Sequence, residues 1–152
     1  MYRLSVIAGL LVVMLSGCPS DGGMAAISGS RVSDEQQIAM IMDDVQLGIQ
    51  RRQIYKVLAH VARGYRDEAG RDYEAVRDRA GELMKAYHKV DLTRALPKIL
   101  VKGDQARVVE TFGLSGEPAE SDKYLPVNMQ GNAVVFLYKL NGVWLITSVT
   151  LQ

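Results

Sequence analysis

The chain has 152 residues, the size of a single domain, and a formal charge of +1 from 18 basic and 17 acidic residues. Hydrophobic residues make up 48% of it and charged residues 23%, as in an ordinary globular protein. These values exclude a disordered chain and a coiled-coil rod. The near-neutral charge argues against nucleic acid as a partner, and a single cysteine excludes a disulfide scaffold.

The first residues have the pattern of an export signal rather than of a folded element. Arg3 precedes an apolar run over residues 4–15, shorter than the roughly 20 residues of a membrane-spanning helix. The run ends in Leu15-Ser16-Gly17-Cys18, which resembles the lipobox of bacterial lipoproteins. The resemblance implies that residues 1–17 are a signal peptide that is removed. It also implies that Cys18, whose thiolate is readily alkylated, carries acyl chains that hold the protein in a membrane.

Residues 18–32 are predicted to be the lipidated cysteine and a tether. They are rich in Gly, Ser and Ala without an apolar period, a composition typical of flexible linkers, although Ala25-Ala26-Ile27 could also pack as an extra strand. Aspartate after the cysteine retains enteric lipoproteins in the inner membrane, whereas this chain has Pro19 there. The resemblance therefore implies the cell envelope, and the periplasmic face of the outer membrane if the organism has two membranes.

Three amphipathic helices are predicted at the start of the folded domain. Ser33 opens a capping box, and apolar residues then recur at helical spacing over residues 38–49. A second helical period runs from residue 54 to about Gly64. After a polar turn, Asp72 is placed to cap a third helix that extends to Tyr87.

The apolar pattern changes to a period of two after the third helix, which predicts four strands at residues 96–101, 106–114, 132–140 and 143–151. Pro97 is expected at an edge or a bulge. The segment 115–130 contains Gly and Pro and is predicted to be a long loop. Asn141-Gly142 predicts a type I′ turn between the last two strands.

This turn predicts the register of the last hairpin. One face would hold Tyr138 with Leu145, Phe136 with Thr147 and Val134 with Val149, and the other would hold Leu137 with Ile146 beside Trp144. Both faces carry apolar side chains, so one is expected to meet the helices and the other to be covered by curvature, the tail or a second subunit. Leu137, Trp144 and Ile146 are therefore the predicted interface of a homodimer formed through the sheet.

The order of these elements resembles the nuclear transport factor 2-like superfamily, also called SnoaL-like. The resemblance spans residues 33–152 and is carried by the turn 65–73, the segment 102–106 and the ending Gly142-Val143-Trp144-Leu145-Ile146. It implies an α+β fold, with three N-terminal helices packed on a curved four-stranded antiparallel sheet to make a cone with a pocket inside. The superfamily includes isomerases, hydrolases, cyclases and non-catalytic binding or dimerising modules, so the resemblance does not select a function.

The candidate pocket consists of aromatic residues and one acid: Tyr55, Tyr65, Asp67, Tyr87, Phe112, Phe136 and Tyr138. An Asp base beside a hydrogen-bonding Tyr would resemble the ketosteroid isomerase type of site. The alternative, which we favour, is that the aromatic residues belong to the core and Asp67 caps a turn. We predict no metal and no other cofactor, because the histidines are far apart, no ligand cluster has metal spacing, and a glycine-rich phosphate loop is absent.

The predicted function is that of a membrane-anchored envelope lipoprotein without catalysis, which binds a small apolar ligand or a protein partner. One alternative is a periplasmic isomerase or hydrolase that uses Asp67 with Tyr65 or Tyr138. The other is a structural dimerisation module.

Overall fold

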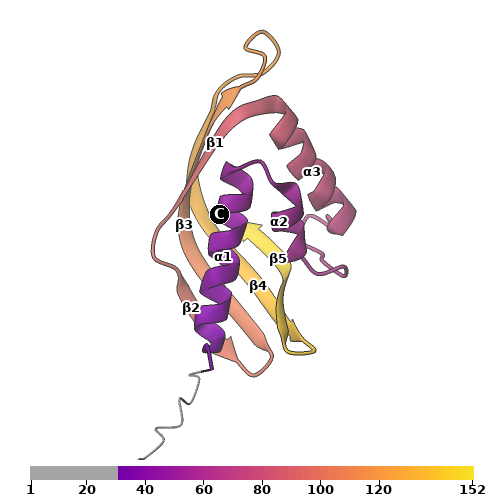
Figure 1. The fold of residues 1–152 in the computed structure, drawn as a ribbon, viewed down its shortest axis with the longest axis vertical. Helices are drawn as coiled ribbons and strands as arrows, with labels where there is room; N and C mark the ends of the chain where they lie inside the picture. The colour runs from indigo at the N-terminus through magenta and orange to yellow at the C-terminus, as the bar shows by residue number, and fades with distance from the viewer. Residues whose placement is uncertain (1–30) are drawn as a thin grey trace, which may run out of the picture. The chain divides into compact units, whose positions relative to one another are not determined.

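The computed structural model describes residues 31–152, so the predicted signal peptide, Cys18 and nearly all of the tether lie outside the described residues. Three helices precede a curved antiparallel sheet (Figure 1). The elements are α1 (Asp34–Gln50), α2 (Ile54–Ala59), α3 (Tyr73–Ala86), β1 (Tyr87–Arg94), β2 (Lys98–Lys102), β3 (Gln105–Pro118), β4 (Val127–Leu140) and β5 (Val143–Leu151). The predicted α+β architecture is confirmed, but the sheet has five strands rather than four.

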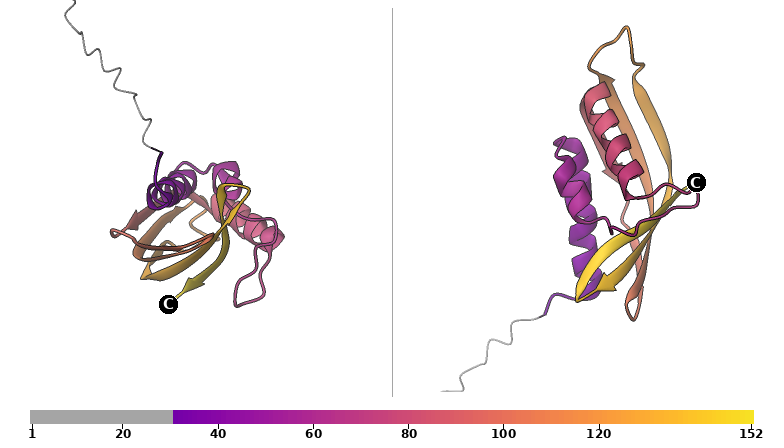
Figure 2. Two further views of the ribbon diagram at one scale, coloured as in Figure 1. Left: turned by 90° about the horizontal axis from the view of Figure 1, so that it is seen from below. Right: turned by 90° about the vertical axis from the view of Figure 1, so that its right-hand side faces the viewer.

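The strands follow the order β1-β3-β4-β5, and β2 pairs with the same strand, β3, as β1 does. Residues 95–97 separate β1 from β2, and Pro97, which has no amide hydrogen to donate, lies in this break as expected. The helices lie on one side of the sheet (Figure 2). No helix among residues 31–152 has the length and the apolar content needed to cross a membrane.

The predicted loop over residues 115–130 is wrong at both ends. Strand β3 continues to Pro118 and β4 begins at Val127, so only residues 119–126 form the connection. Glycine is needed at position 116, because a Cβ there would lie 2.8 Å from Cγ1 of Val127 and 3.0 Å from Cδ1 of Tyr87. Here glycine marks a close approach of neighbouring side chains within a strand rather than a turn.

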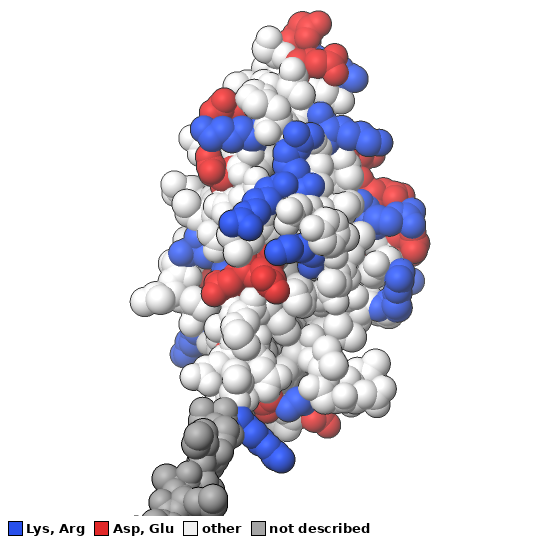
Figure 3. All heavy atoms as spheres, in the orientation of Figure 1, with Lys and Arg blue, Asp and Glu red and all other residues white. Residues whose placement is uncertain are grey.

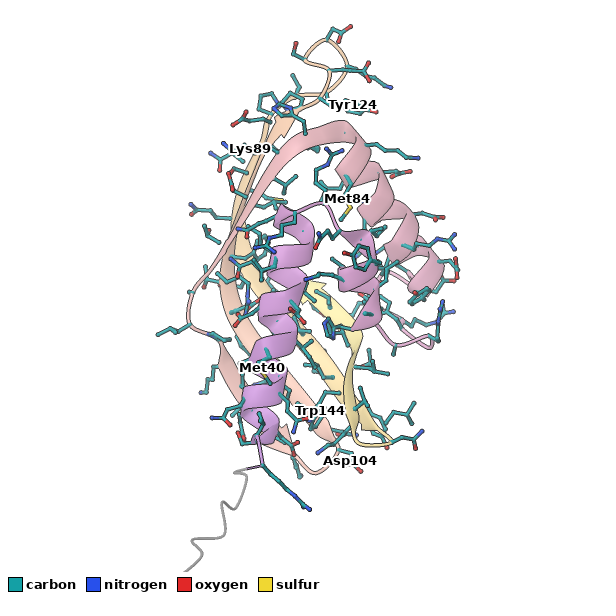
Figure 4. The ribbon with its side chains drawn as sticks, in the orientation of Figure 1. Met40, Met84, Lys89, Asp104, Tyr124 and Trp144 are labelled. Carbon is teal, nitrogen blue, oxygen red and sulfur yellow. The ribbon has the colours of Figure 1, made fainter. Side chains whose placement is uncertain are left out.

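The start of α1 is fixed both locally and by the sheet. The predicted capping box is present: the Gln36 amide donates to Oγ of Ser33 at 3.2 Å, and the Ser33 amide donates to Oε1 of Gln36 at 3.0 Å. Asp34, in the first turn, accepts hydrogen bonds from Nε1 of Trp144 at 3.0 Å and from Nζ of Lys139 at 2.6 Å. Figure 4 shows Trp144 close to this end of α1.

The core lies between α1 and the inner face of the sheet. It contains Ile38 and Met42 from α1 and the alternating inner residues of the strands, Ala106 and Val108, Val135 and Leu137, and Trp144 and Ile146. Ile38 and Val108 are 0% exposed and Trp144 is 1% exposed. On β4, Phe136 and Tyr138 alternate with the core residues Val135 and Leu137, so they point to the outer face and are exposed.

The hairpin register is correct only near the turn. Asn141 and Gly142 have positive φ angles of 51° and 81°, and Tyr138 pairs with Leu145 as predicted. A bulge then shifts the register, so Phe136 pairs with Ser148 and the predicted pairing with Thr147 is wrong. The shift also brings Val149 opposite Val135 instead of Val134.

The bulge lies where the chain after α2 joins the free edge of β5. The amide of Ile146 donates to the carbonyl of His60 at 2.7 Å, and the amide of Ala62 donates to the carbonyl of Ile146 at 2.8 Å. The amide of Arg66 donates to the carbonyl of Thr147 at 3.1 Å. This pairing places Val61 beside Ile146 at the sheet edge, so the second helix ends at Ala59 and not near Gly64 as predicted.

Candidate functional site

An apolar cavity of about 250 Å³ lies between α1, α3 and the inner face of the sheet. Its walls include Val45 and Ile49 from α1 and Leu83 from α3. Across from them lie side chains of β1, β3, β4 and β5, namely Leu92, Glu110, Phe112, Leu114, Met129, Ala133, Val135, Ile146, Val149 and Leu151. The walls are apolar with one exception, the carboxylate of Glu110.

A backbone bulge and a small side chain make room for this cavity. The β5 bulge turns Val149 and Leu151 to the inner face, where without it they would point outwards. On β4, Ala133 pairs with Glu110, and this small side chain leaves space beside the carboxylate. The cavity therefore depends on the register shift that the alternation of residues did not predict.

Glu110 is held by Arg94 in a buried ion pair. Nε of Arg94 donates to Oε2 of Glu110 at 2.8 Å, and the two side chains are 7% and 5% exposed. Nη1 of Arg94 reaches Oδ1 of Asp43 at 3.2 Å and Oε1 of Gln46 at 3.3 Å, both on α1. Arg94 is the last residue of β1, and its side chain thus connects this strand to β3 and to α1. It also balances the buried charge of Glu110.

The glutamine side chains of α1 reinforce this link at the wall of the cavity. Nε2 of Gln46 and Nε2 of Gln50 donate to the same carbonyl, that of Leu92, at 2.8 and 3.0 Å. Both amide groups lie one turn apart on the helix face that meets β1. The polar groups around Arg94 therefore fix the distance between helix and sheet beside an otherwise apolar space.

The structure brings together only part of the predicted pocket. Phe112 lines the cavity, and Tyr65 and Asp67 line a smaller hollow of about 180 Å³ with Val149 and Leu151. The other four aromatic residues lie elsewhere, and for them the prediction is wrong. Tyr55 is 65% exposed, Phe136 and Tyr138 lie on the outer face, and Tyr87 donates from its hydroxyl to the carbonyl of Leu125 near the 119–126 connection.

Asp67 organises the turn before α3, as the alternative interpretation proposed. Its Oδ1 accepts from the amides of Ala69 and Arg71, both at 3.0 Å, and its Oδ2 accepts from Nε of Arg71 at 2.6 Å and from the hydroxyl of Tyr65 at 3.4 Å. Burial raises the pKa of Asp67, but the hydrogen bonds and charge of Arg71 outweigh it, so the pKa is lowered. A carboxylate with four donors and a lowered pKa is a poor general base.

The same contacts make Tyr65 a poor proton donor to any reaction. Burial and the neighbouring Asp67 carboxylate both raise the pKa of its hydroxyl. Its hydroxyl is directed to Asp67, while Tyr138 lies on the opposite side of the sheet. The acid–tyrosine arrangement considered from the sequence is therefore a turn structure and not a converging catalytic pair.

The predicted interface residues lie in the core. Leu137, Trp144 and Ile146 are 2%, 1% and 4% exposed because their face of the hairpin packs under α1. The prediction that they form an open surface is wrong, and the exposed face of the hairpin is the one that carries Phe136 and Tyr138.

Arg94 and the role of Glu110 were missed because β1 was not predicted. The sequence Tyr-His-Lys-Val-Asp-Leu-Thr-Arg of β1 has only two aliphatic residues in alternation, a weak strand signal. The available signal was Glu110 itself, an acid on the apolar face of a predicted strand, which requires a buried partner. Among residues 31–152, no three His, Cys, Asp or Glu side chains converge as metal ligands would.

Known structures resemble this domain in fold at low sequence identity. A nuclear transport factor 2-like superfamily protein from Salmonella enterica serovar Typhimurium superposes with a TM-score of 0.67 at 16% identity, over 78% of this chain and 89% of that one. A hexachlorocyclohexane dehydrochlorinase, LinA type 2, gives a TM-score of 0.66 at 14% identity, over 78% and 83% of the two chains. Bd1075 of Bdellovibrio bacteriovorus gives 0.66 at 15% identity, over 77% of this chain.

The domain therefore has the same fold as a solved nuclear transport factor 2-like protein. The chain spans only 40% of the length of Bd1075. No protein-family model and no curated protein sequence matches the chain. The structural neighbours thus identify the fold but not the function of this domain.

Proposed function

We propose that this domain binds a small apolar molecule in the cavity between α1, α3 and the sheet, as the folded part of an envelope lipoprotein. The observation that carries the proposal is a space of about 250 Å³ whose walls are apolar except at Glu110. An apolar cavity of about 150 Å³ is already large enough to hold benzene. A ligand of roughly ten non-hydrogen atoms would therefore fill this one.

Binding is a better account than catalysis by the residues considered from the sequence. The carboxylate of Asp67 is occupied by Arg71, Ala69 and Tyr65, and it lines the smaller hollow instead of the main cavity. An isomerase or hydrolase that uses Asp67 as its base would have to weaken the ion pair of Oδ2 with Arg71 in every cycle. We therefore propose a carrier or sensor of an apolar ligand.

A cavity-filling substitution tests the binding proposal. Ala133→Phe places a ring in the cavity, so uptake of naphthalene by the full chain is expected to fall at least roughly tenfold, with an overpacking cost of about 1–3 kcal/mol. Val134→Phe is the matched control, because its side chain points to the outer face of the same strand. Equal naphthalene uptake by the two variants, measured by equilibrium dialysis, would contradict binding in the cavity.

The anchor is proposed from the Leu15-Ser16-Gly17-Cys18 motif, which lies outside the described residues. Cys18→Ser removes the thiol that lipidation requires, so the protein is expected to move from the membrane fraction to the soluble fraction and to lose incorporation of labelled palmitate. Ser16→Ala keeps a small residue in the motif and serves as the control. Palmitate labelling of the Cys18→Ser protein would reject the anchor.

The outer face of the sheet supports a second candidate function, self-association. Four exposed apolar side chains lie there on the neighbouring strands β4 and β5: Phe136, Tyr138, Leu140 and Val143. A contiguous exposed apolar patch is typical of an interaction surface. If two copies pair through this face, Phe136→Glu will halve the mass measured by analytical ultracentrifugation. A mass of one chain for the unaltered protein would rule out self-association.

A further inference from the structure

One oxygen of the buried Glu110 carboxylate has no protein partner. Oε2 accepts from Nε of Arg94 at 2.8 Å, but no hydrogen bond to Oε1 is found within residues 31–152. The Glu110 side chain is 5% exposed and lines the cavity, so Oε1 is the carboxylate oxygen left for a molecule inside it. An ionised carboxylate oxygen accepts hydrogen bonds and cannot donate them.

We propose that the ligand of this cavity is a neutral apolar alcohol or phenol whose hydroxyl donates a hydrogen bond to Oε1 of Glu110. The inference rests on the proposed function, because it names the ligand class of the same cavity. A hydroxyl placed there would satisfy the remaining lone pairs of a buried charge, and such charge-assisted hydrogen bonds are stronger than neutral ones. The rest of the ligand would contact only aliphatic and aromatic side chains.

The charges around the site favour a neutral donor over an ammonium group. Arg94 already balances the charge of Glu110 at 2.8 Å, so a cationic ligand would bring an uncompensated charge into the apolar cavity. The third charged group of the cluster, Asp43, is 71% exposed and contributes little. An anionic ligand is disfavoured in turn, because its negative charge would face Oε1 directly.

The surface charges and the hollow beside Asp67 do not offer a comparable site. Charged side chains of both signs are interspersed on the face shown in Figure 3, as expected for a solvated surface of ion pairs. Asp67 is fully engaged by its turn, and the hollow beside it is smaller than the main cavity. Glu110 combines a side chain that is 5% exposed, an Oε1 atom with no hydrogen bond from residues 31–152, and an adjacent cavity.

Three probes with one bicyclic skeleton test the inference on the full chain: tetralin, 1-tetralol and 1-tetralone. Tetralin carries no polar group, the tetralol adds a hydroxyl donor, and the tetralone adds an acceptor only. Equilibrium dialysis gives the Kd of each, with the Ala133→Phe protein as background so that only probe bound in the cavity is counted. We expect the tetralol to bind at least roughly tenfold tighter than tetralin, and the tetralone no tighter than tetralin.

Glu110→Gln supplies a second, independent readout. The glutamine carbonyl can keep the hydrogen bond from Nε of Arg94, which turns the amide NH₂ group, a donor, toward the cavity in place of Oε1. The preference for tetralol over tetralone is then expected to fall roughly tenfold. Should this variant fail to fold in a thermal melt, the comparison of the three probes on the unaltered chain decides alone.

The outcomes separate the inference from the function on which it rests. Equal affinity of the three probes for the unaltered chain would overturn the hydroxyl assignment and leave apolar binding in place. A tetralone preference in the unaltered chain, or an unchanged tetralol preference in a folded Glu110→Gln protein, would also overturn it. Failure of all three probes to bind would remove the proposed function itself.

Discussion

Replacing Arg94 with methionine will destabilise the domain by about 3–5 kcal/mol, because it leaves the carboxylate of Glu110 buried without its counter-charge. Both side chains of the pair are nearly inaccessible, at 7% and 5% exposure, so water compensates only weakly for the lost guanidinium. The same substitution removes the contacts of Nη1 with Asp43 and Gln46, which hold α1 against the end of β1. The loss is measured as the free energy of unfolding in urea.

Two further variants distinguish a buried charge from a simple loss of packing. Asp43→Asn removes the charge of a side chain that contacts Arg94 but is itself 71% exposed. The substitution is therefore expected to lower the free energy of unfolding by less than about 1 kcal/mol. In Arg94→Met with Glu110→Leu the unpaired charge is absent, so the double variant should be more stable than Arg94→Met alone. A double variant that is no more stable than the single one would show that the ion pair is not the source of the loss.

The ion pair of Arg94 and Glu110 could not be predicted from the sequence. The sequence predicts the three helices and the Asn141-Gly142 turn, because local periodicity and turn chemistry determine them. The order of the elements was enough to suggest the cone fold. Arg94 and Glu110 are 16 positions apart and meet only because β1 pairs with β3. Without β1 in the predicted topology, the acid on the apolar face of β3 had no visible partner.

The β5 bulge was hidden from the sequence for a different reason. Residues 143–146 are apolar on both faces, and the only local sign of a change of face was that regular alternation would place Ser148 and Thr150 on the side of Trp144 and Ile146. The bulge coincides with hydrogen bonds to the segment after α2, which is distant in the chain: the carbonyls of Ile146 and Thr147 accept from the amides of Ala62 and Arg66. Long-range pairing thus determined which side chains of β5 line the cavity.

The outer and inner faces of the last hairpin are expected to respond very differently to truncation. Trp144→Ala will cost about 3–5 kcal/mol of unfolding free energy, because the indole is 1% exposed and packs in the cluster of Ile38, Met42 and Leu137. Val143→Ala, at the preceding position, changes a side chain that is 58% exposed and should stay within about 0.5 kcal/mol. Urea unfolding of the two variants measures the difference.

Trp144→Phe separates the packing of the indole from its hydrogen bond to Asp34. The phenyl ring keeps much of the buried volume but cannot donate, and Asp34 retains Nζ of Lys139 as a partner at 2.6 Å. The phenylalanine variant should therefore lose clearly less stability than the alanine variant. Because Trp144 does not line the cavity, it should also bind tetralin with unchanged affinity. Equal losses for the two variants would mean that the contact with Asp34, and not burial of the ring, holds α1 to the hairpin.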